Sequence, residues 1–341
     1  MALLIATPVQ AQKSTKKPAK IAKKTVVVAP PETMKPLTTP MVLSYRLKEG
    51  ASQRYKIRAY LNGRIPPFAT DASSPPTHIL IVFEYVATVK SVSEKGATVE
   101  YTVPVAELSL LENEPPADFN VPAKEITPLS DLVSLTEIQK IFNCTAVIRP
   151  DGTVAEVKGG NNSKVKVDIG IDLRKLFLIT APIAFTETTV KAGDSWAPTD
   201  GLLGNLPART LYAAKLETAQ AGAKTALATL SETAESTIID SLDREGNSTA
   251  DKKAQVGSLK GEAKLKGAFR FRATAGTAKL PAGVVALSYT GIVEDGRLDL
   301  TVNMDRMMPD PDKPGAKLTL PIDVRATFFV KSAETPVVKK K

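Results

Sequence analysis

Charged and apolar residues alternate with a period of two in the segment 54–59, and this pattern constrains the fold more than any other feature of the chain. Arg54, Lys56 and Arg58 stand at every second position, and the residues between them are apolar. Successive side chains of a β-strand point to opposite faces of its sheet, so a strand would separate the two sets. The segment therefore predicts a strand with one buried face and one basic, exposed face.

A second segment, 263–273, repeats this alternation. Phe269 and Phe271 lie on one face of the predicted strand. The basic residues on the other face are Lys264, Lys266, Arg270 and Arg272. Two such segments, far apart in the sequence, favour a protein built mainly from half-buried strands.

Short turn signals separate the predicted strands. Arg149-Pro150-Asp151-Gly152 lies between apolar runs and predicts a hairpin, because Pro, Asp and Gly each favour tight turns for a physical reason. Residues 93–97, Gly222-Ala223 and Glu294-Asp295-Gly296 predict further hairpins. The signals follow the same order in both halves of the chain, which suggests an internal duplication. The alternative is that generic hairpins recur by chance.

These patterns predict a mainly β fold: an antiparallel curved sheet, half-barrel or sandwich, built from two similar lobes with one or two short helices. We expect the first lobe at residues 41–198 and the second at 199–331. The better helix candidate is 173–179, and residues 130–141 fit either a short helix or a loop that runs into a strand. The polar segment 240–262 is expected to be a loop.

The ends of the chain differ from its body in charge. Residues 1–37 carry seven lysines against one glutamate, residues 331–341 carry four against one, and the body between them is neutral, although the whole chain has a net charge of +9. An apolar run followed by Val9-Gln10-Ala11 predicts a residual export signal at 1–11. Residues 12–40 are expected to form a disordered basic linker, and 332–341 a basic tail. The expected location is extracytoplasmic, periplasmic or secreted.

The segment 190–198 contains the only tryptophan of the chain. Gly193, Asp194 and Ser195 predict a turn directly before Trp196. A large indole beside a turn is expected to be a structural anchor, with Gly193 and Asp194 shaping the turn and Trp196 packing on the core. Stacking of Trp196 on a ligand is the alternative.

The sequence offers little catalytic or metal-binding chemistry. It has one cysteine, Cys144, and one histidine, His78, so a disulfide, a multi-thiolate zinc site and a histidine cluster are excluded. No glycine-rich phosphate loop and no nucleophile elbow is present. We therefore expect no enzymatic activity, no cofactor and no metal. We also expect no specific nucleic-acid partner and no membrane-spanning segment.

The motif Val190-Lys191-Ala192-Gly193-Asp194-Ser195-Trp196 resembles a signature of a family of exported bacterial proteins of unknown function. In that family a Val-Lys-x-Gly-Asp-Ser/Thr-Trp motif follows a proline-bearing segment. The segments 45–50 and 149–152 are similar to the opening strand and the central hairpin of the same family. The resemblance extends over residues 41–330 and implies a β-rich architecture and export. It implies no catalytic residues.

The two basic strand faces are the best candidate ligand-binding residues. If the strands were neighbours, like charges would repel across them, and a bound anion such as a phosphate or lipid head group would relieve the repulsion. The alternative is two distant, solvated faces that acidic residues balance. The expected function is non-catalytic binding of an apolar or amphiphilic, lipid-like ligand in the concavity of the sheet. The alternative function is an envelope scaffold or interaction module with a filled core and no ligand. The oligomeric state is left open.

Overall fold

The computed structural model describes residues 33–64, 73–112, 125–128, 134–160, 174, 178, 180–198, 201, 210–244, 249–276, 280–310, 312–313 and 315–333. The chain divides into a unit Met1–Thr33 and a unit Met34–Lys341. All the described strands and the described helix belong to the second unit. The predicted export signal at 1–11 lies outside the described residues, as do most of the linker and of the basic tail.

One antiparallel, curved sheet contains almost all of the regular structure, which confirms the predicted fold class. The described strands are β1 (Lys35–Pro36), β2 (Met41–Tyr45), β3 (Ser52–Arg64), β4 (Thr77–Ser93), β5 (Gly96–Leu111), β6 (Glu125–Pro128), β7 (Cys144–Ile148), β8 (Val154–Lys158), β9 (Ser195–Trp196), β10 (Thr210–Ala221), β11 (Ala226–Leu242), β12 (Gly257–Gly276), β13 (Val285–Pro309) and β14 (Lys317–Ala333). The one described helix is α1 (Leu135–Phe142).

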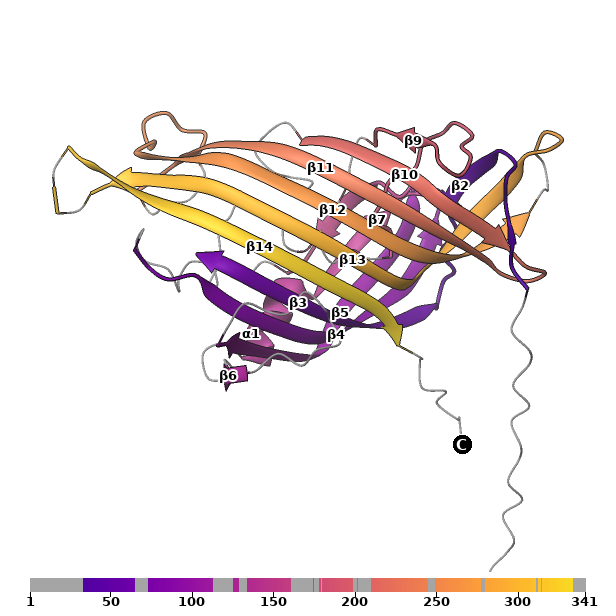
Figure 1. Ribbon diagram of the computed structural model, residues 1–341, viewed down its shortest axis with the longest axis horizontal. Coiled ribbons are helices and arrows are strands. Elements are labelled where there is room, and N and C mark those ends of the chain that lie inside the picture. Colours follow the sequence, from indigo (N-terminus) through magenta and orange to yellow (C-terminus); the bar gives the residue numbers. More distant parts are fainter. Residues whose placement is uncertain are drawn as a thin grey trace, which may run out of the picture. The chain divides into compact units, whose positions relative to one another are not determined.

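The sheet runs in the order β1-β10-β11-β12-β13-β14-β3-β4-β5-β7-β8, and most neighbours are strands that follow each other in the chain (Figure 1). The exceptions are β1 with β10, β5 with β7, and β14 with β3, the last of which pairs residues 323–333 with residues 54–64. The short strands β6 and β9 add to β5 and β10, and β2 pairs in parallel with β13. The two predicted lobes thus contribute to a single sheet and a single compact unit.

The strands bury one face each, and these faces share one apolar cluster. On β3, Tyr55, Ile57 and Ala59 are buried, as the alternation predicts. The cluster also takes residues from strands next to both ends of the sheet, such as Ile148 on β7 and Leu216 on β10. Because distant strands bury side chains in the same cluster, the sheet must curve around it. We call the side that faces this cluster the inner face and the opposite side the outer face.

Segment 180–190 packs inside the curve of the sheet. Phe185 stacks on Tyr45 with ring centroids 4.5 Å apart and lies 4.9 Å from the ring of Tyr289. Tyr45 donates a hydrogen bond from its hydroxyl group to the carbonyl oxygen of Ile183 at 3.0 Å. The described part of the interior is therefore filled by the chain's own side chains.

The predicted turn and anchor around Trp196 are present. Gly193 has a φ of 97°, and the side chain of Asp194 accepts a hydrogen bond from the backbone N–H of Lys191 at 2.8 Å. Trp196 is half-buried, donates from Nε1 to the carbonyl of Ala184 at 2.8 Å, and packs edge-on against Phe185. These contacts agree with a structural role for the indole.

One predicted hairpin is wrong. Glu294-Asp295-Gly296 lies inside the continuous strand β13, where the register with β12 shifts between Arg270 and Phe271. The segment forms a β-bulge, which lets Glu294 and Asp295 pair with arginines on β12. The proposed duplication thereby loses one of its matching turns and stays a prediction.

Three other boundaries differ from the predictions. The segment 240–262 is strand at both ends, because β11 extends to Leu242 and β12 begins at Gly257, and the described residues between them belong to no strand. The helix forms at Leu135–Phe142, where Ser134 and Glu137 make a capping box, while the candidate at 173–179 lies outside the described residues except for Arg174 and Leu178. The body starts before residue 41, since β1 pairs with β10.

Candidate functional site: a cationic groove on the outer face

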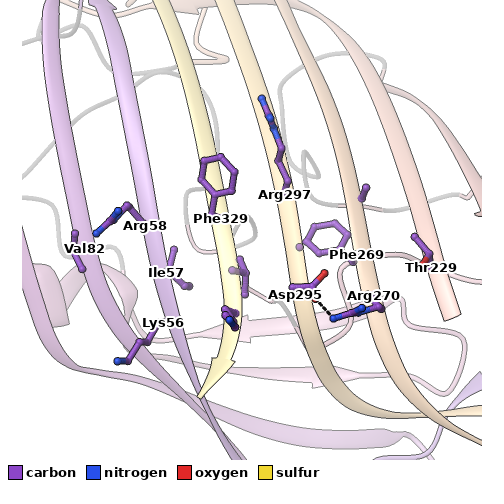
Figure 2. A pocket seen from close by; sticks show the side chains of 14 residues that line it. Lys56, Ile57, Arg58, Val82, Thr229, Phe269, Arg270, Asp295, Arg297 and Phe329 are labelled. Carbon is purple, nitrogen blue, oxygen red and sulfur yellow. Dashed lines mark hydrogen bonds and ion pairs between the residues drawn. The ribbon is translucent and has the colours of Figure 1, made fainter. Parts of the chain in front are cut away.

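A groove of about 760 Å³ lies on the outer face where β12, β13, β14 and β3 run side by side (Figure 2). Most of its lining residues form two rows on the outer face, and each row consists of residues that stand opposite one another on neighbouring strands. The remaining lining residues form the floor of the groove. The first row is Lys56, Lys331, Asp295, Arg270 and Thr229. The second row is Val82, Arg58, Phe329, Arg297 and Ala268. The floor is Ile57, Val330, Gly296 and Phe269.

The first row is cationic. Lys56 on β3 stands directly opposite Lys331 on β14, and Lys331 stands opposite Asp295 on β13. Asp295 is ion-paired with Arg270 of β12, the next strand along. Only one carboxylate of the row lines the groove, so the row carries a surplus of positive charge.

The second row combines apolar surface with two arginines. Phe329 is partly exposed between Arg58 and Arg297, and the guanidinium of Arg297 lies 5.4 Å from the centroid of its ring. Arg297 also makes a two-point ion pair with Asp299. Val82 and Phe329 pack against a second buried apolar cluster formed by Tyr60, Leu80 and Leu111. The row thus extends the groove toward an apolar region.

The floor of the groove contains a glycine beside an aromatic ring. A Cβ atom on Gly296 would lie 2.4 Å from Cδ1 of Phe269, so a larger residue does not fit there without a shift. In the outer row next to it, Ala268 has only a methyl group. The short side chain of Ala268 leaves space on the outer face, whereas the ring of Phe269 occupies the space beside Gly296.

The structure brings three of the seven candidate basic residues together and separates the other four. Lys56, Arg58 and Arg270 line the groove, although β3 and β12 are separated by β13 and β14. The other four candidates lie outside its lining: Arg54, Lys264, Lys266 and Arg272. Three of these four pair with acids, as the balanced-face alternative expected, namely Arg54 with Glu84, Lys264 with Glu262 and Arg272 with Glu294.

Sequence reasoning missed Lys331, Arg297 and Phe329. Neither Phe329 nor Arg297 belongs to a pattern described above, and Lys331 enters only as one of the charges of residues 331–341. The period-two pattern in fact continues through Thr327, Phe329 and Lys331, and this signal could have found them. Which strand would lie beside β3 was not visible in the local pattern.

Among the described residues, the inner face carries buried tyrosines and one buried glutamate, Glu232. Burial raises the pKa of Tyr289, and burial, together with the nearby Tyr289, raises the pKa of Tyr45, so both stay neutral at physiological pH. Among the residues that the structure describes, no group of three or more His, Cys, Asp or Glu side chains is placed to hold a metal ion. No described helix has the length and apolarity needed to cross a membrane.

No protein-family model and no curated protein matches this chain. Among solved structures, the chain is similar to lipovitellin, in a structure titled for its lipid-protein interactions, with 8% identity, a TM-score of 0.43, and coverage of 87% of this chain and 27% of that one. It is also similar to OmpF of Salmonella typhi in complex with daunomycin, with 5% identity, a TM-score of 0.23, and coverage of 83% and 98%. An outer membrane channel from Pseudomonas putida F1 gives 9% identity, a TM-score of 0.20, and coverage of 85% and 97%. These similarities are too weak to carry an argument about function.

Proposed function

We propose that this protein binds an amphiphilic, lipid-like ligand without catalysing a reaction, and that the ligand lies in the outer-face groove. The proposal rests on one observation, namely that the first and second rows of the groove lie side by side on the outer face. One row is cationic, and the other exposes Phe329 and Val82. A molecule with a polar head and an apolar tail could contact both rows at once.

The size of the groove fits such a ligand. Its volume of about 760 Å³ falls within the range of small-molecule sites in proteins, which is roughly 300–1,000 Å³. The apolar row leads on to the cluster of Tyr60, Leu80 and Leu111, so an acyl chain would find apolar contacts beyond Phe329. Burial of a tail against these side chains would supply the main driving force for binding.

The groove replaces the site that the alternation first suggested, the concavity of the sheet. There the described inner-face residues are buried against each other and against Phe185, Ile183 and Leu178. An added ligand would have to displace these packed side chains, which is costly in a close-packed interior. The outer face needs no such rearrangement.

The proposal includes a location outside the cytoplasm. It is supported by the apolar run and the small residues at 1–11, which fit an export signal. The basic tails would add weak, salt-sensitive attraction to anionic surfaces of an envelope.

A scaffold function is the second candidate. Leu211 on β10 and Ile239 on β11 are 59% and 63% exposed on the outer face of neighbouring strands. Exposed apolar side chains on adjacent strands can mark a contact with another protein. Together with the filled interior, these exposed residues favour the scaffold function if the groove binds no ligand.

The proposal is tested by titrating the purified full chain with dodecyl maltoside below its micelle concentration, followed by calorimetry. We expect saturable binding that weakens about tenfold in Phe329→Ala, because the tail loses the apolar surface of the ring. Leu318→Ala is the matched control, since Leu318 is an exposed apolar residue of the same strand outside the groove, and it should bind as the parent does. Absence of saturable binding to the parent would contradict the proposal and favour the scaffold.

A further inference from the structure

We infer that the groove recognises the phosphate group of an anionic amphiphile, and that Lys56 and Lys331 are the residues that hold it. This inference rests on the proposed function and adds the class of head group. It follows from the register of the strands, from the ion pairs around the groove and from the position of Phe329.

The first step concerns the register. Lys56 and Lys331 are directly opposite residues on paired strands, where Cβ atoms lie about 4.5–5.5 Å apart and like charges destabilise the sheet. Both side chains are exposed on the outer face and both line the groove. For stability alone, an acid or a neutral residue at one of the two positions would be more favourable than a second lysine.

The second step concerns the neighbouring carboxylates. Glu84 is in register with Lys56 but forms its ion pair with Arg54 at 3.1 Å. Asp295 is in register with Lys331 but forms its ion pair with Arg270. Both acids adjoining the lysines therefore have arginine partners. Within the described part of the chain, neither lysine has an ion pair of its own.

The same outer face shows what a balanced arrangement looks like. One strand away, Arg272 pairs with Glu294, and in the second row Arg297 pairs with Asp299 at 2.9 Å. Several cations on this face are thus matched with acids, although Lys266 has no ion pair within the described part of the chain. The Lys56–Lys331 pair is distinct because two lysines stand directly opposite each other where the groove lies. This coincidence points to a ligand that supplies the missing negative charge.

The charge of the pair selects the head group. Two ammonium groups carry two positive charges, and a phosphate monoester carries about −1.5 to −2 at neutral pH with three acceptor oxygens. Lysine binds phosphate as a flexible point charge, and hydrogen bonds to an ionised phosphate are stronger than those between neutral groups. A carboxylate would neutralise only one of the two lysines.

The direction of the tail follows from β14. Phe329 stands two residues before Lys331 on the same face of β14. It lies opposite Arg58 on β3, and Arg58 in turn lies opposite Val82 on β4. A phosphate held between the two lysines would leave its alkyl chain to run along the second row toward Val82 and the cluster of Tyr60, Leu80 and Leu111. Head and tail thus meet different rows of one groove.

The inference is tested with the full chain at low ionic strength, using dodecyl phosphate, dodecyl maltoside and inorganic phosphate as probes. We expect dodecyl phosphate to bind at least about tenfold more tightly than the maltoside, and the preference to shrink when the pH falls from about 7.5 to 5, where the phosphate loses charge. The double variant Lys56→Gln/Lys331→Gln should lose this preference and keep its affinity for the maltoside.

Lys266→Gln is the matched control, because Lys266 is an exposed lysine on the same face outside the groove. It should bind dodecyl phosphate within about twofold of the parent, since Lys266 does not line the groove and stands opposite an acid, Asp299, rather than opposite another lysine. Circular dichroism of each variant shows whether it remains folded. Both lysines are on the surface, so their replacement should leave the fold intact.

The outcomes separate the two proposals. Equal affinities for dodecyl phosphate and dodecyl maltoside, or a preference that survives the double variant, would overturn the inference and leave the proposed function standing. Binding of neither amphiphile would overturn both. Inorganic phosphate that binds as tightly as dodecyl phosphate would keep the lysine pair as a phosphate site and overturn the role of the tail.

Discussion

The two faces of strand β3 differ in role, although residues of the two faces alternate along the same thirteen-residue strand. On the inner face, Tyr55 and Ile57 are almost fully buried in the main cluster, and Tyr55 donates a hydrogen bond to the carbonyl of Gly291 at 2.9 Å. On the outer face, Lys56 and Arg58 line the groove. Between Tyr55 and Arg58, alternate residues thus belong to the core and to the groove.

The contrast teaches that the two properties can be changed separately. Substitutions on the inner face should lower the free energy of unfolding and leave the affinity of the folded protein unchanged. Substitutions in the outer rows should alter affinity and hardly affect unfolding. The four predictions below test this separation.

The largest expected effect is on the inner side, at Trp196. Replacing it by alanine should lower the free energy of unfolding by about 3 kcal/mol, because the indole loses its packing on Phe185 and its hydrogen bond to Ala184. Chemical denaturation measures the loss. Ile239→Ala is the control, since Ile239 is 63% exposed and should change stability little. A Trp196→Ala protein as stable as the parent would refute the anchor role.

The next effect concerns the floor of the groove, where the two faces meet. Gly296→Ala should cost about 2 kcal/mol, because the new methyl group would overlap the ring of Phe269, which is buried. Gly276→Ala provides the comparison, since no atom lies within 4 Å of a Cβ atom at that position. Thermal melting of both variants distinguishes them, and equal melting temperatures would contradict the close contact.

A smaller effect separates two buried tyrosines. Tyr55→Phe should lower stability by about 1 kcal/mol, because the carbonyl of Gly291 loses its hydrogen bond. Tyr289→Phe should cost less or even stabilise, because the Tyr289 hydroxyl is buried with no hydrogen-bond partner in the part of the chain that the structure describes. Urea denaturation gives both values. The reverse order would show that the hydroxyl of Tyr289 is satisfied in solution.

The smallest effect lies within the outer face. A double-mutant cycle on Lys56 and Lys331 should give an unfavourable coupling of about 0.3 kcal/mol at low salt, which disappears as salt screens the pair. The same cycle on Arg270 and Asp295 should give a favourable coupling of about 0.5 kcal/mol, typical of an exposed ion pair. Couplings of the same sign would contradict the expected difference between the repulsive lysine pair and the attractive ion pair.

The sequence predicted the strands better than their partners. The alternation at 54–59 correctly assigned each residue to a face, because facing depends only on local period. That β14 would pair with β3 and bring Lys331 opposite Lys56 depends on long-range register, for which the local pattern carries no signal. Three of the seven candidate site residues were therefore found, and Lys331 and Phe329 were not.

Local signals also failed where tertiary context overrode them. Asp295-Gly296 has the composition of a hairpin turn, yet pairing with β12 and β14 on both sides holds it inside a long strand as a bulge. By contrast, the capping box of Ser134 and Glu137 was present in the sequence and would have fixed the start of α1. The position of Asp295-Gly296 thus depends on long-range pairing, whereas the start of α1 is encoded in the local sequence.

The pairing of β14 with β3 also determines the order in which the molecule can assemble. The amide of Gln53 donates to the carbonyl of Ala333 across a separation of 280 residues, so one edge of β3 stays open until β14 has been synthesised. Contacts between such distant residues are reached slowly, and an unpaired strand edge is prone to join a neighbouring molecule in the meantime. Until then β4 is the described strand that pairs with β3, and the seventeen-residue β14 covers the remaining edge once it has formed.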